Sequence, residues 1–353
     1  MISPLVRCAA SHKRTIISRC LPVTSSSSLF QAHRILSPVL TQPSQNRFST
    51  PPLQTVRMSS TNPANKNFTR DALFNVKGRV ALVTGGGSGI GLMITQVLVA
   101  NGAKVYITGR TKEKLDRVVE KYSEGEGSIV PIQADITSKE EIRKLVSTLE
   151  SKESKLDILV NNAGISGSTL ETSASSAEEA KKNLFDAEAS TFEDWTSVYQ
   201  TNVSQIFFTS TAFLPLLQKA SEADHGWSAT VLNITSISGL VKTAQHHFQY
   251  NASKAAANHL TRMLATELAS ENGFRVRINA IAPGVFPSEM TASSSDENQK
   301  SQLDAGKYQN KVPARRPGRD EDMAQAALFA VVNQYVNGEV IVVDGGYTIA
   351  AGK

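Results

Sequence analysis

Seven short apolar runs, separated by stretches long enough for helices, constrain the fold of this chain more than any other feature. The runs are rich in Val and Ile: RVALVTG (79–85), AKVYITG (103–109), SIVPIQAD (128–135), LDILVNNAG (156–164), ATVLNITS (229–236), VRINAIAPG (276–284) and EVIVVDGG (339–346). Nearly continuous apolar strands that alternate with helices are typical of a parallel sheet covered on both faces. Because crossovers between parallel strands are right-handed, the sequence predicts an α/β fold, a single domain with a doubly wound parallel sheet of seven strands.

The alternating pattern begins near Phe74, and the chain before it has a different composition. Residues 1–70 contain nine Lys or Arg, no Asp or Glu, a run of four serines and several prolines. An Arg-rich, Ser-rich and acid-free N-terminus is typical of a mitochondrial transit peptide. We therefore expect a leader (1–70), a folded domain (71–353) and a mitochondrial location. The alternatives are a basic disordered tail of no targeting value, or an internal start at Met58 that yields a cytoplasmic form.

The net charge of +5 comes from this leader. Residues 71–353 carry 28 basic and 32 acidic residues, so the folded part is mildly acidic and gives no argument for nucleic-acid binding. The sequence has no apolar run long enough to span a bilayer. Both cysteines, Cys8 and Cys20, lie in the leader, so the domain is expected to have neither a disulfide nor thiol chemistry. We predict no metal site, no nucleic-acid partner and no membrane contact.

A glycine-rich turn, TGGGSGIG, joins the first strand to the helix that follows it. Gly85, Gly89 and Gly91 have the spacing G-x3-G-x-G, which permits a tight turn and lets the backbone approach a pyrophosphate at the helix N-terminus. Ser88 and Ile90 belong to the same turn. A glycine turn alone is weak evidence, but its place between a strand and a helix predicts a dinucleotide-binding site.

The end of the second strand indicates which dinucleotide is bound. An acidic residue there would hold the ribose 2′-hydroxyl, but this chain has Gly109 followed by Arg110 and Lys112. A guanidinium suits a phosphate, so we expect NADP(H) in preference to NAD(H); the alternative is that Arg110 only faces solvent. Asp135, with Ile136 after it, ends the third strand and is a candidate partner for the adenine, with helix capping as its alternative role.

The stretch YNASK places Tyr250 and Lys254 on one face of a predicted helix. Alone, such a pair is usually an ordinary surface pair. Together with the other motifs it resembles the short-chain dehydrogenase/reductase family. The resemblance runs from Val76 to about Ile349 and rests on motifs in order: TGGGSGIG, NNAG (161–164), Asn202 in YQTNVSQIFF, Ser236 in NITSISG, YNASK, NAIAPG (279–284) and VDGG (343–346).

The resemblance implies a Rossmann fold and an oxidoreductase that transfers a hydride between a nicotinamide cofactor and a carbonyl or secondary alcohol. It places a catalytic tetrad on Asn202, Ser236, Tyr250 and Lys254. Tyr250 would donate the proton, Ser236 would bond the carbonyl, Lys254 would lower the phenol's pKa and bind the nicotinamide ribose, and Asn202 would support a water linked to Lys254. Ser238 is the alternative serine. We also expect a homo-oligomer, a dimer or a tetramer.

Further cofactor contacts implied by the resemblance follow the fourth and sixth strands: Asn162, Ala163, Gly164, Pro283, Gly284 and Ser288. The first three would pack behind the cofactor. Pro283 and Gly284 would bend the chain beside the nicotinamide, and Ser288 stands where the family often has a threonine that contacts the cofactor.

Two polar segments are expected to flank the substrate: a surface insertion (166–190) and a lid (288–312). His246 and His247 precede the tyrosine and either line the substrate mouth or are incidental. The stretches PGVFPSEMT, LTRMLATELA and RRPGRDEDMA resemble the bacterial β-ketoacyl reductases of the rhamnolipid branch, which favours a 3-oxoacyl thioester as substrate. Other ketones, sugars, polyols or aromatic carbonyls are alternatives, and an NADP-binding pseudoenzyme or scaffold is a remote one.

Overall fold

The computed structural model of the chain describes residues 63–309 and 311–352, so most of the predicted leader lies outside the described residues. A 3₁₀ helix η1 (Pro63–Phe68) and a short helix α1 (Arg70–Leu73) precede one parallel sheet of seven strands, in the order β3-β2-β1-β4-β5-β6-β7. The strands are β1 (Val80–Thr84), β2 (Lys104–Gly109), β3 (Ser128–Gln133), β4 (Ile158–Asn161), β5 (Ala229–Ile234), β6 (Val276–Pro283) and β7 (Val340–Val343). The predicted doubly wound sheet is confirmed.

Burial along the strands explains why the sequence showed continuous apolar runs. Every residue of β1, β4, β5 and β6 is buried, because these strands have neighbours on both sides and helices on both faces. The edge strands β3 and β7 are mostly half-buried.

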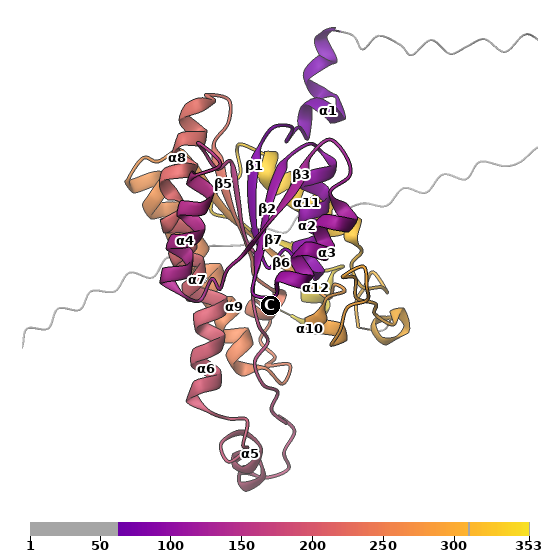
Figure 1. Cartoon of the computed structure of the whole chain (residues 1–353). Coiled ribbons are helices and arrows are strands. Elements are labelled where there is room, and N and C mark those ends of the chain that lie inside the picture. Colours follow the sequence, from indigo (N-terminus) through magenta and orange to yellow (C-terminus); the bar gives the residue numbers. More distant parts are fainter. Residues whose placement is uncertain (1–62, 310, 353) are drawn as a thin grey trace, which may run out of the picture. The chain divides into compact units, whose positions relative to one another are not determined.

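Helices cover the two faces of the sheet (Figure 1). One face carries α2 (Gly89–Ala100), α3 (Lys112–Tyr122) and α11 (Asp320–Val332), whose apolar side chains form one core cluster. The other carries α4 (Lys139–Glu150), α7 (Gln205–Ala212), α8 (Leu214–Ala223) and α9 (Phe248–Leu264), which form a second cluster. No helix in the described ranges combines the length and the apolarity needed to cross a bilayer.

The predicted insertion (166–190) contains α5 (Ala177–Leu184), which buries no residue, and leads into α6 (Phe192–Tyr199). Figure 1 shows α5 at the end of this segment remote from the sheet. The first residues of the insertion nevertheless contact the chain around α9: the Leu170 N–H donates to the His246 carbonyl at 2.9 Å, and the Gln249 amide donates to the Ser168 carbonyl at 2.6 Å. The insertion therefore begins beside the helix that carries the predicted proton donor.

The predicted lid (288–312), called the lid segment below, contains α10 (Glu289–Ala292) and a 3₁₀ turn η5 (Ala305–Tyr308). It contacts the α2, α3 and α11 face of the sheet. The Tyr122 hydroxyl donates to the Asn298 carbonyl at 2.7 Å, and the Lys300 ammonium bonds Gln96 and Asp320. The remaining elements are the π-helical segments η2 (Gln200–Ser204) and η4 (Ala265–Glu271), the 3₁₀ turn η3 (Ile237–Gly239) and α12 (Tyr347–Ala351).

Candidate active site

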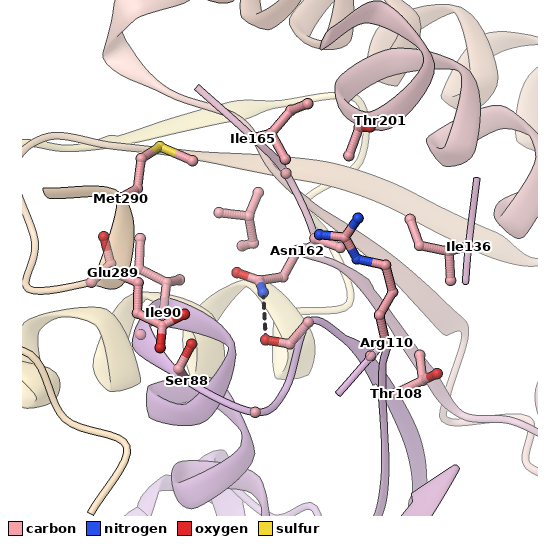
Figure 2. A pocket seen from close by; sticks show the side chains of 18 of the residues that line it. Ser88, Ile90, Thr108, Arg110, Ile136, Asn162, Ile165, Thr201, Glu289 and Met290 are labelled. Atoms are coloured by element: carbon pink, nitrogen blue, oxygen red, sulfur yellow. Dashed lines mark hydrogen bonds between the residues drawn. The ribbon is translucent and has the colours of Figure 1, made fainter. Parts of the chain in front are cut away.

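The carboxyl ends of the strands border a cavity of about 340 Å³ at the place where the strand order changes direction, between β1 and β4 (Figure 2). Doubly wound sheets bind ligands at this switch point. The cavity lining includes the following predicted site residues: Gly85, Ser88, Gly89, Ile90, Arg110, Asp135, Ile136, Asn162, Ala163, Gly164, Tyr250, Lys254 and Ser288.

The turns after β1 and β4 are locked together at this cavity. The Asn162 amide donates to the carbonyl oxygens of Thr84 at 2.9 Å and Gly85 at 3.1 Å. The Thr84 hydroxyl in turn accepts from the N–H groups of Asn162 at 2.9 Å and Ala163 at 3.1 Å. Gly91 lies so close that a Cβ on it would be 2.2 Å from the Gly85 carbonyl oxygen. Gly91 therefore serves the close packing of α2 against the turn.

The N-terminus of α2 suits a phosphate group of a dinucleotide. Ser88 is the N-cap residue, but its hydroxyl does not cap the first N–H groups of the helix, which leaves them available to an anion. Gly89 has φ 53°, and a Cβ on it would lie 2.9 Å from the Ser288 Cβ. A larger residue at position 89 would therefore fill the gap between the glycine turn and the lid segment.

Arg110 and Asp135 line the cavity at the ends of β2 and β3. Arg110 extends into the cavity (Figure 2), and its guanidinium has no hydrogen-bond or ion-pair partner in the described part of the chain. Asp135 accepts from the N–H of Thr137 at 2.9 Å and from its hydroxyl at 2.7 Å. Burial acts to raise the pKa of Asp135, but these bonds and the charge of Arg110 lower it below its ordinary value. The first helix after β3, α4, has Ser138 as its N-cap residue, so Asp135 does not cap it.

Tyr250 and Lys254 lie one turn apart on α9 and both line the cavity. Lys254 is only 4% exposed, donates to the Ile234 carbonyl at 3.1 Å and has its Nζ 5.6 Å from the centre of the Tyr250 ring. Burial lowers the pKa of Lys254 to about 8. Burial also raises the pKa of Tyr250, against the opposite effect of the Ser236 hydroxyl. At neutral pH the site therefore holds a neutral phenol beside an ammonium, which is the state that a proton donor requires.

Ser236 and Ser238 have different partners. The Ser236 hydroxyl accepts from the Ser238 N–H at 3.1 Å and interacts with Tyr250. The Ser238 hydroxyl donates to the Gln245 side chain at 2.9 Å, and that side chain donates to the Tyr347 hydroxyl at 2.9 Å. The contact with Tyr250 supports the choice of Ser236.

Asn202 lies in the π-helical segment η2 and is 1% exposed. Its side chain accepts from the Ile165 N–H at 2.9 Å and donates to the Ile165 carbonyl at 2.9 Å and to the Ser253 hydroxyl at 3.0 Å. A Cβ on Gly164 would lie 3.0 Å from the Asn202 Oδ1 and 3.5 Å from the Lys254 Nζ. Asn202 thus fixes the turn after β4 against α9, while its link to a water stays a prediction.

Some predicted residues lie outside the cavity lining: Gly91, Asn202, Ser236, Pro283 and Gly284. Gly284 follows β6 and packs against Asp344, whose Cα would be 2.7 Å from an added Cβ. The nicotinamide contacts of Pro283 and Gly284 stay predictions. Sequence reasoning missed several lining residues: Thr108, Lys114, Thr201, Glu289 and Met290.

His246 and His247 contact different neighbours. His246 follows Gln245, and both are left-handed, with φ 66° and 53°. The His246 backbone carbonyl accepts from the Leu170 N–H, and the His246 ring Nδ1 lies 3.1 Å from the Leu170 carbonyl oxygen. The His247 ring centre is 6.3 Å from that of Tyr250, and burial lowers the pKa of His247. A substrate contact for either histidine stays a prediction.

The arrangement of the cavity, the glycine turn, Tyr250 and the buried Lys254 agrees with the comparison with known proteins. The model of the family described as short chain dehydrogenase matches residues 79–299. The chain belongs to the short-chain dehydrogenase family. Membership shows an oxidoreductase that uses a nicotinamide cofactor. The cavity residues above fit such a cofactor, because the N-terminus of α2 has no side-chain cap and the Arg110 guanidinium has no ion-pair partner among the described residues.

Relatives of this short-chain dehydrogenase span most of its described length. The short-chain dehydrogenase/reductase PhomF of Diaporthe leptostromiformis is 38% identical over 280 residues, which cover 78% of this chain and 92% of the relative. The rhamnolipids biosynthesis 3-oxoacyl-(acyl-carrier-protein) reductase of Pseudomonas aeruginosa is 37% identical over 277 residues, or 78% of this chain and 98% of the relative.

Solved structures of other family members have the same fold. The Pseudomonas aeruginosa RhlG/NADP active-site complex is similar with a TM-score of 0.63 and 34% identity, over 78% of this chain and 98% of that one. A 7α-hydroxysteroid dehydrogenase complexed with NADH and 7-oxo glycochenodeoxycholic acid has a TM-score of 0.63 and 30% identity, over 78% and 96%. Both structures contain a nicotinamide cofactor, but of different kinds. Within residues 63–309 and 311–352 this short-chain dehydrogenase has no group of three or more His, Cys, Asp or Glu that could hold a metal ion.

Lys254→Met should stabilise this short-chain dehydrogenase at neutral pH. The pKa of Lys254 is lowered from 10.5 to about 8, so its charged form destabilises the fold at and below pH 8, and this effect disappears above 10.5 where lysine is neutral in both states. A pKa shift of this size corresponds to roughly 3 kcal/mol of unfolding free energy. This value is an upper limit for the gain in the variant, because Lys254→Met also removes the hydrogen-bond donor of the Ile234 carbonyl. Calorimetry should give the variant a higher melting temperature at neutral pH and a smaller difference in alkali. An equal or lower melting temperature at neutral pH contradicts a buried, charged lysine.

Proposed function

We propose that this short-chain dehydrogenase is an NADP(H)-dependent reductase of carbonyl groups, with 3-oxoacyl thioesters as its substrate class. The observation that carries the proposal is the geometry around Tyr250: a neutral phenol faces the cavity, with the ammonium of Lys254 on the next turn of the same helix and the hydroxyl of Ser236 beside it.

In this proposal the cofactor supplies a hydride, and the residues of the chain supply the proton and the orientation. Ser236 and Tyr250 both donate hydrogen bonds to the substrate oxygen, and Tyr250 gives up its proton as negative charge develops there. The Lys254 ammonium stabilises the phenolate that is left and favours its formation. Asn202 acts at a distance, because its bonds to Ile165 hold the turn after β4 in place.

The preference for NADP(H) rests on the charges at the ends of β2 and β3. Arg110 reaches into the cavity and its guanidinium pairs with no residue that the structure describes, and Gly109 offers no carboxylate to a free ribose hydroxyl. An unpaired guanidinium in a cavity is a binding site for a phosphate. The 2′-phosphate distinguishes NADP(H) from NAD(H), so Arg110 is assigned to it.

The substrate class rests on two supports. The 3-oxoacyl reductase from Pseudomonas aeruginosa is similar over almost its whole length. Two segments also adjoin the cavity and are proposed to hold the acyl chain: the insertion, which begins directly after the lining residue Ile165, and the lid segment, which lines the cavity at Ser288. A second candidate is a cyclic ketone, because the similar hydroxysteroid dehydrogenase was solved with a 7-oxo bile acid.

Purified enzyme should oxidise NADPH with acetoacetyl and longer 3-oxoacyl thioesters faster than with steroid, sugar or aromatic carbonyls. Tyr250→Phe should reduce kcat by about 10²-fold or more, because it removes the proton donor and almost no packing surface. Cofactor affinity should stay nearly unchanged in this variant. The measurement is the loss of NADPH absorbance across the panel, with dissociation constants from cofactor fluorescence.

Ser236→Ala and Ser238→Ala form a matched pair for this experiment, since each removes one hydroxyl from the same loop. Ser236→Ala should lower kcat more than Ser238→Ala. The reverse order would move the carbonyl contact to Ser238, and Tyr250→Phe retaining more than about a tenth of the activity would exclude Tyr250 as the acid.

Arg110→Ala should weaken NADPH binding by roughly 10- to 150-fold and leave NADH binding almost unchanged, since a bond to a charged group contributes about 1.5 to 3 kcal/mol. Adding Gly109→Asp should turn the preference toward NADH through repulsion of the 2′-phosphate. The measurement is the dissociation constant of each cofactor for the wild type and for both variants. Wild type preferring NADH, or Arg110→Ala weakening both cofactors alike, contradicts the assignment.

We further propose that residues 1–70 direct the enzyme to mitochondria, on the strength of their basic and acid-free composition. A fluorescent reporter fused behind these residues should accumulate in mitochondria, and a reporter that begins at Met58 should not. A cytosolic signal from the first fusion would refute the targeting role.

We also propose a homo-oligomer, supported by the exposed aromatic side chains of Phe207 and Phe208 on α7.

A further inference from the structure

An ion pair lies in the lining of the cavity. Lys114 lies in the first turn of α3, and Glu289 is the first residue of α10, 175 positions later in the chain. The Lys114 Nζ and the Glu289 Oε1 are 2.6 Å apart, both residues line the cavity, and their side chains are 36% and 33% exposed. The pair therefore joins the two walls between which the cavity opens.

The Glu289 carboxylate lies at the N-terminus of α2. Figure 2 shows it next to Ser88 and Ile90, and it also accepts from the Ser295 hydroxyl at 2.6 Å. Burial acts to raise the pKa of Glu289, but hydrogen bonds from Lys114, Ser295 and Ser88 lower it, so the group is ionised at neutral pH. An anionic side chain thus lies at the helix end that favours anions.

The cavity cannot keep this arrangement when a dinucleotide binds. A phosphate at the N-terminus of α2 would bring a second negative charge close to Glu289, in a partly buried place where like charges repel more strongly than in water. The ion pair is not the only contact that holds α10, because this short helix has capping bonds of its own. Ser288 and Thr291 cap it reciprocally, and it ends at Ser293 with φ 68°.

We propose that Lys114 is a phosphate-binding residue of this cavity, which exchanges the Glu289 carboxylate for a phosphate of the dinucleotide. This inference rests on the proposed dinucleotide site. The Lys114 ammonium pairs with an anion in both states: the Glu289 carboxylate in the free enzyme and a phosphate in the complex. Glu289 loses its cationic partner in the complex and moves away together with α10. Two phosphates offer the same chemistry: the 2′-phosphate, present only in NADP(H), and the pyrophosphate, present in both cofactors.

A competing explanation is that the pair only braces the lid segment against α3. The two explanations predict different directions of change in cofactor affinity. If Glu289 competes with a phosphate for Lys114, removing the carboxylate tightens cofactor binding and removing the ammonium weakens it. If the pair is a brace, both changes loosen the same contact and weaken binding alike.

The experiment measures the dissociation constants of NADPH and NADH for the full chain with Lys114→Ala, Glu289→Gln and the double variant. Glu289→Gln retains the shape of the side chain and its contact with Ser295. We expect it to tighten binding by about three- to tenfold, and Lys114→Ala to weaken binding about tenfold, the range for a partly exposed charged contact. In the Lys114→Ala background, Glu289→Gln should have no further tightening effect. Effects of the same sign in the two single variants, or no effect of either, overturn the proposal.

The two cofactors identify the phosphate. A change confined to NADPH assigns Lys114 to the 2′-phosphate, and equal changes for NADPH and NADH, still of opposite sign in the two variants, assign it to the pyrophosphate. Equal affinity of the wild type for both cofactors would contradict the proposed NADP(H) preference, but the role of Lys114 would still be decided by whether the two variants change affinity in opposite directions. If neither cofactor binds, both proposals are overturned. Asp320→Asn is the matched control: it breaks the ion pair that joins Lys300 of the same lid segment to Asp320 of α11, outside the cavity. It should change neither dissociation constant, and tightening by Asp320→Asn equal to that by Glu289→Gln would attribute the effect to a looser lid and overturn the proposal.

Discussion

The hydrogen bonds between the turns after β1 and β4 are the constraint on which the site depends. The strand order changes direction between these two strands, so the crossovers leave the sheet on opposite sides and a crevice opens above them. Asn162 and Thr84 fix the two turns to each other with four hydrogen bonds, and Gly91 lets α2 begin directly against them. The position of the α2 N-terminus, and with it the place for a phosphate, follows from this contact.

A second set of contacts fixes the chemistry at the other end of the cavity. Lys254 is buried where β5 ends and donates to Ile234, while Asn202 uses the π-helical turn of η2 to hold Ile165 and Ser253. π-Helical turns are frequent at functional sites because they redirect side chains within a helix. The consequence is that the phenol of Tyr250 meets a buried ammonium and a hydroxyl, while α9, η2 and the turn after β4 are held as one unit.

The sequence was sufficient for the sheet and the glycine turn because each has a local signal, while the tetrad stays a prediction. Buried parallel strands are apolar at nearly every position, and a strand followed by glycines and a helix specifies a turn of one kind. The motif alone predicted Ser236 in preference to Ser238, and the structure adds an interaction between the Ser236 hydroxyl and Tyr250 that the spacing does not give. The hydrogen bonds from Ser238 of η3 through Gln245 to Tyr347 of α12 connect residues that no sequence motif relates. The Lys114–Glu289 pair likewise joins residues that only the tertiary fold brings together.

In the proposed reaction, a hydride from a nicotinamide and a proton from Tyr250 reach the same carbonyl group. The most direct measurement is isotope transfer: the enzyme is incubated with NADPH deuterated at C4 of the nicotinamide and a 3-oxoacyl thioester, and the product is examined by mass spectrometry. We expect a 3-hydroxyacyl product that carries one deuterium on C3, bonded to carbon and not exchangeable with water. A 3-hydroxyacyl product without deuterium from either C4-labelled face, or no alcohol product from any carbonyl although NADPH binds, would contradict it.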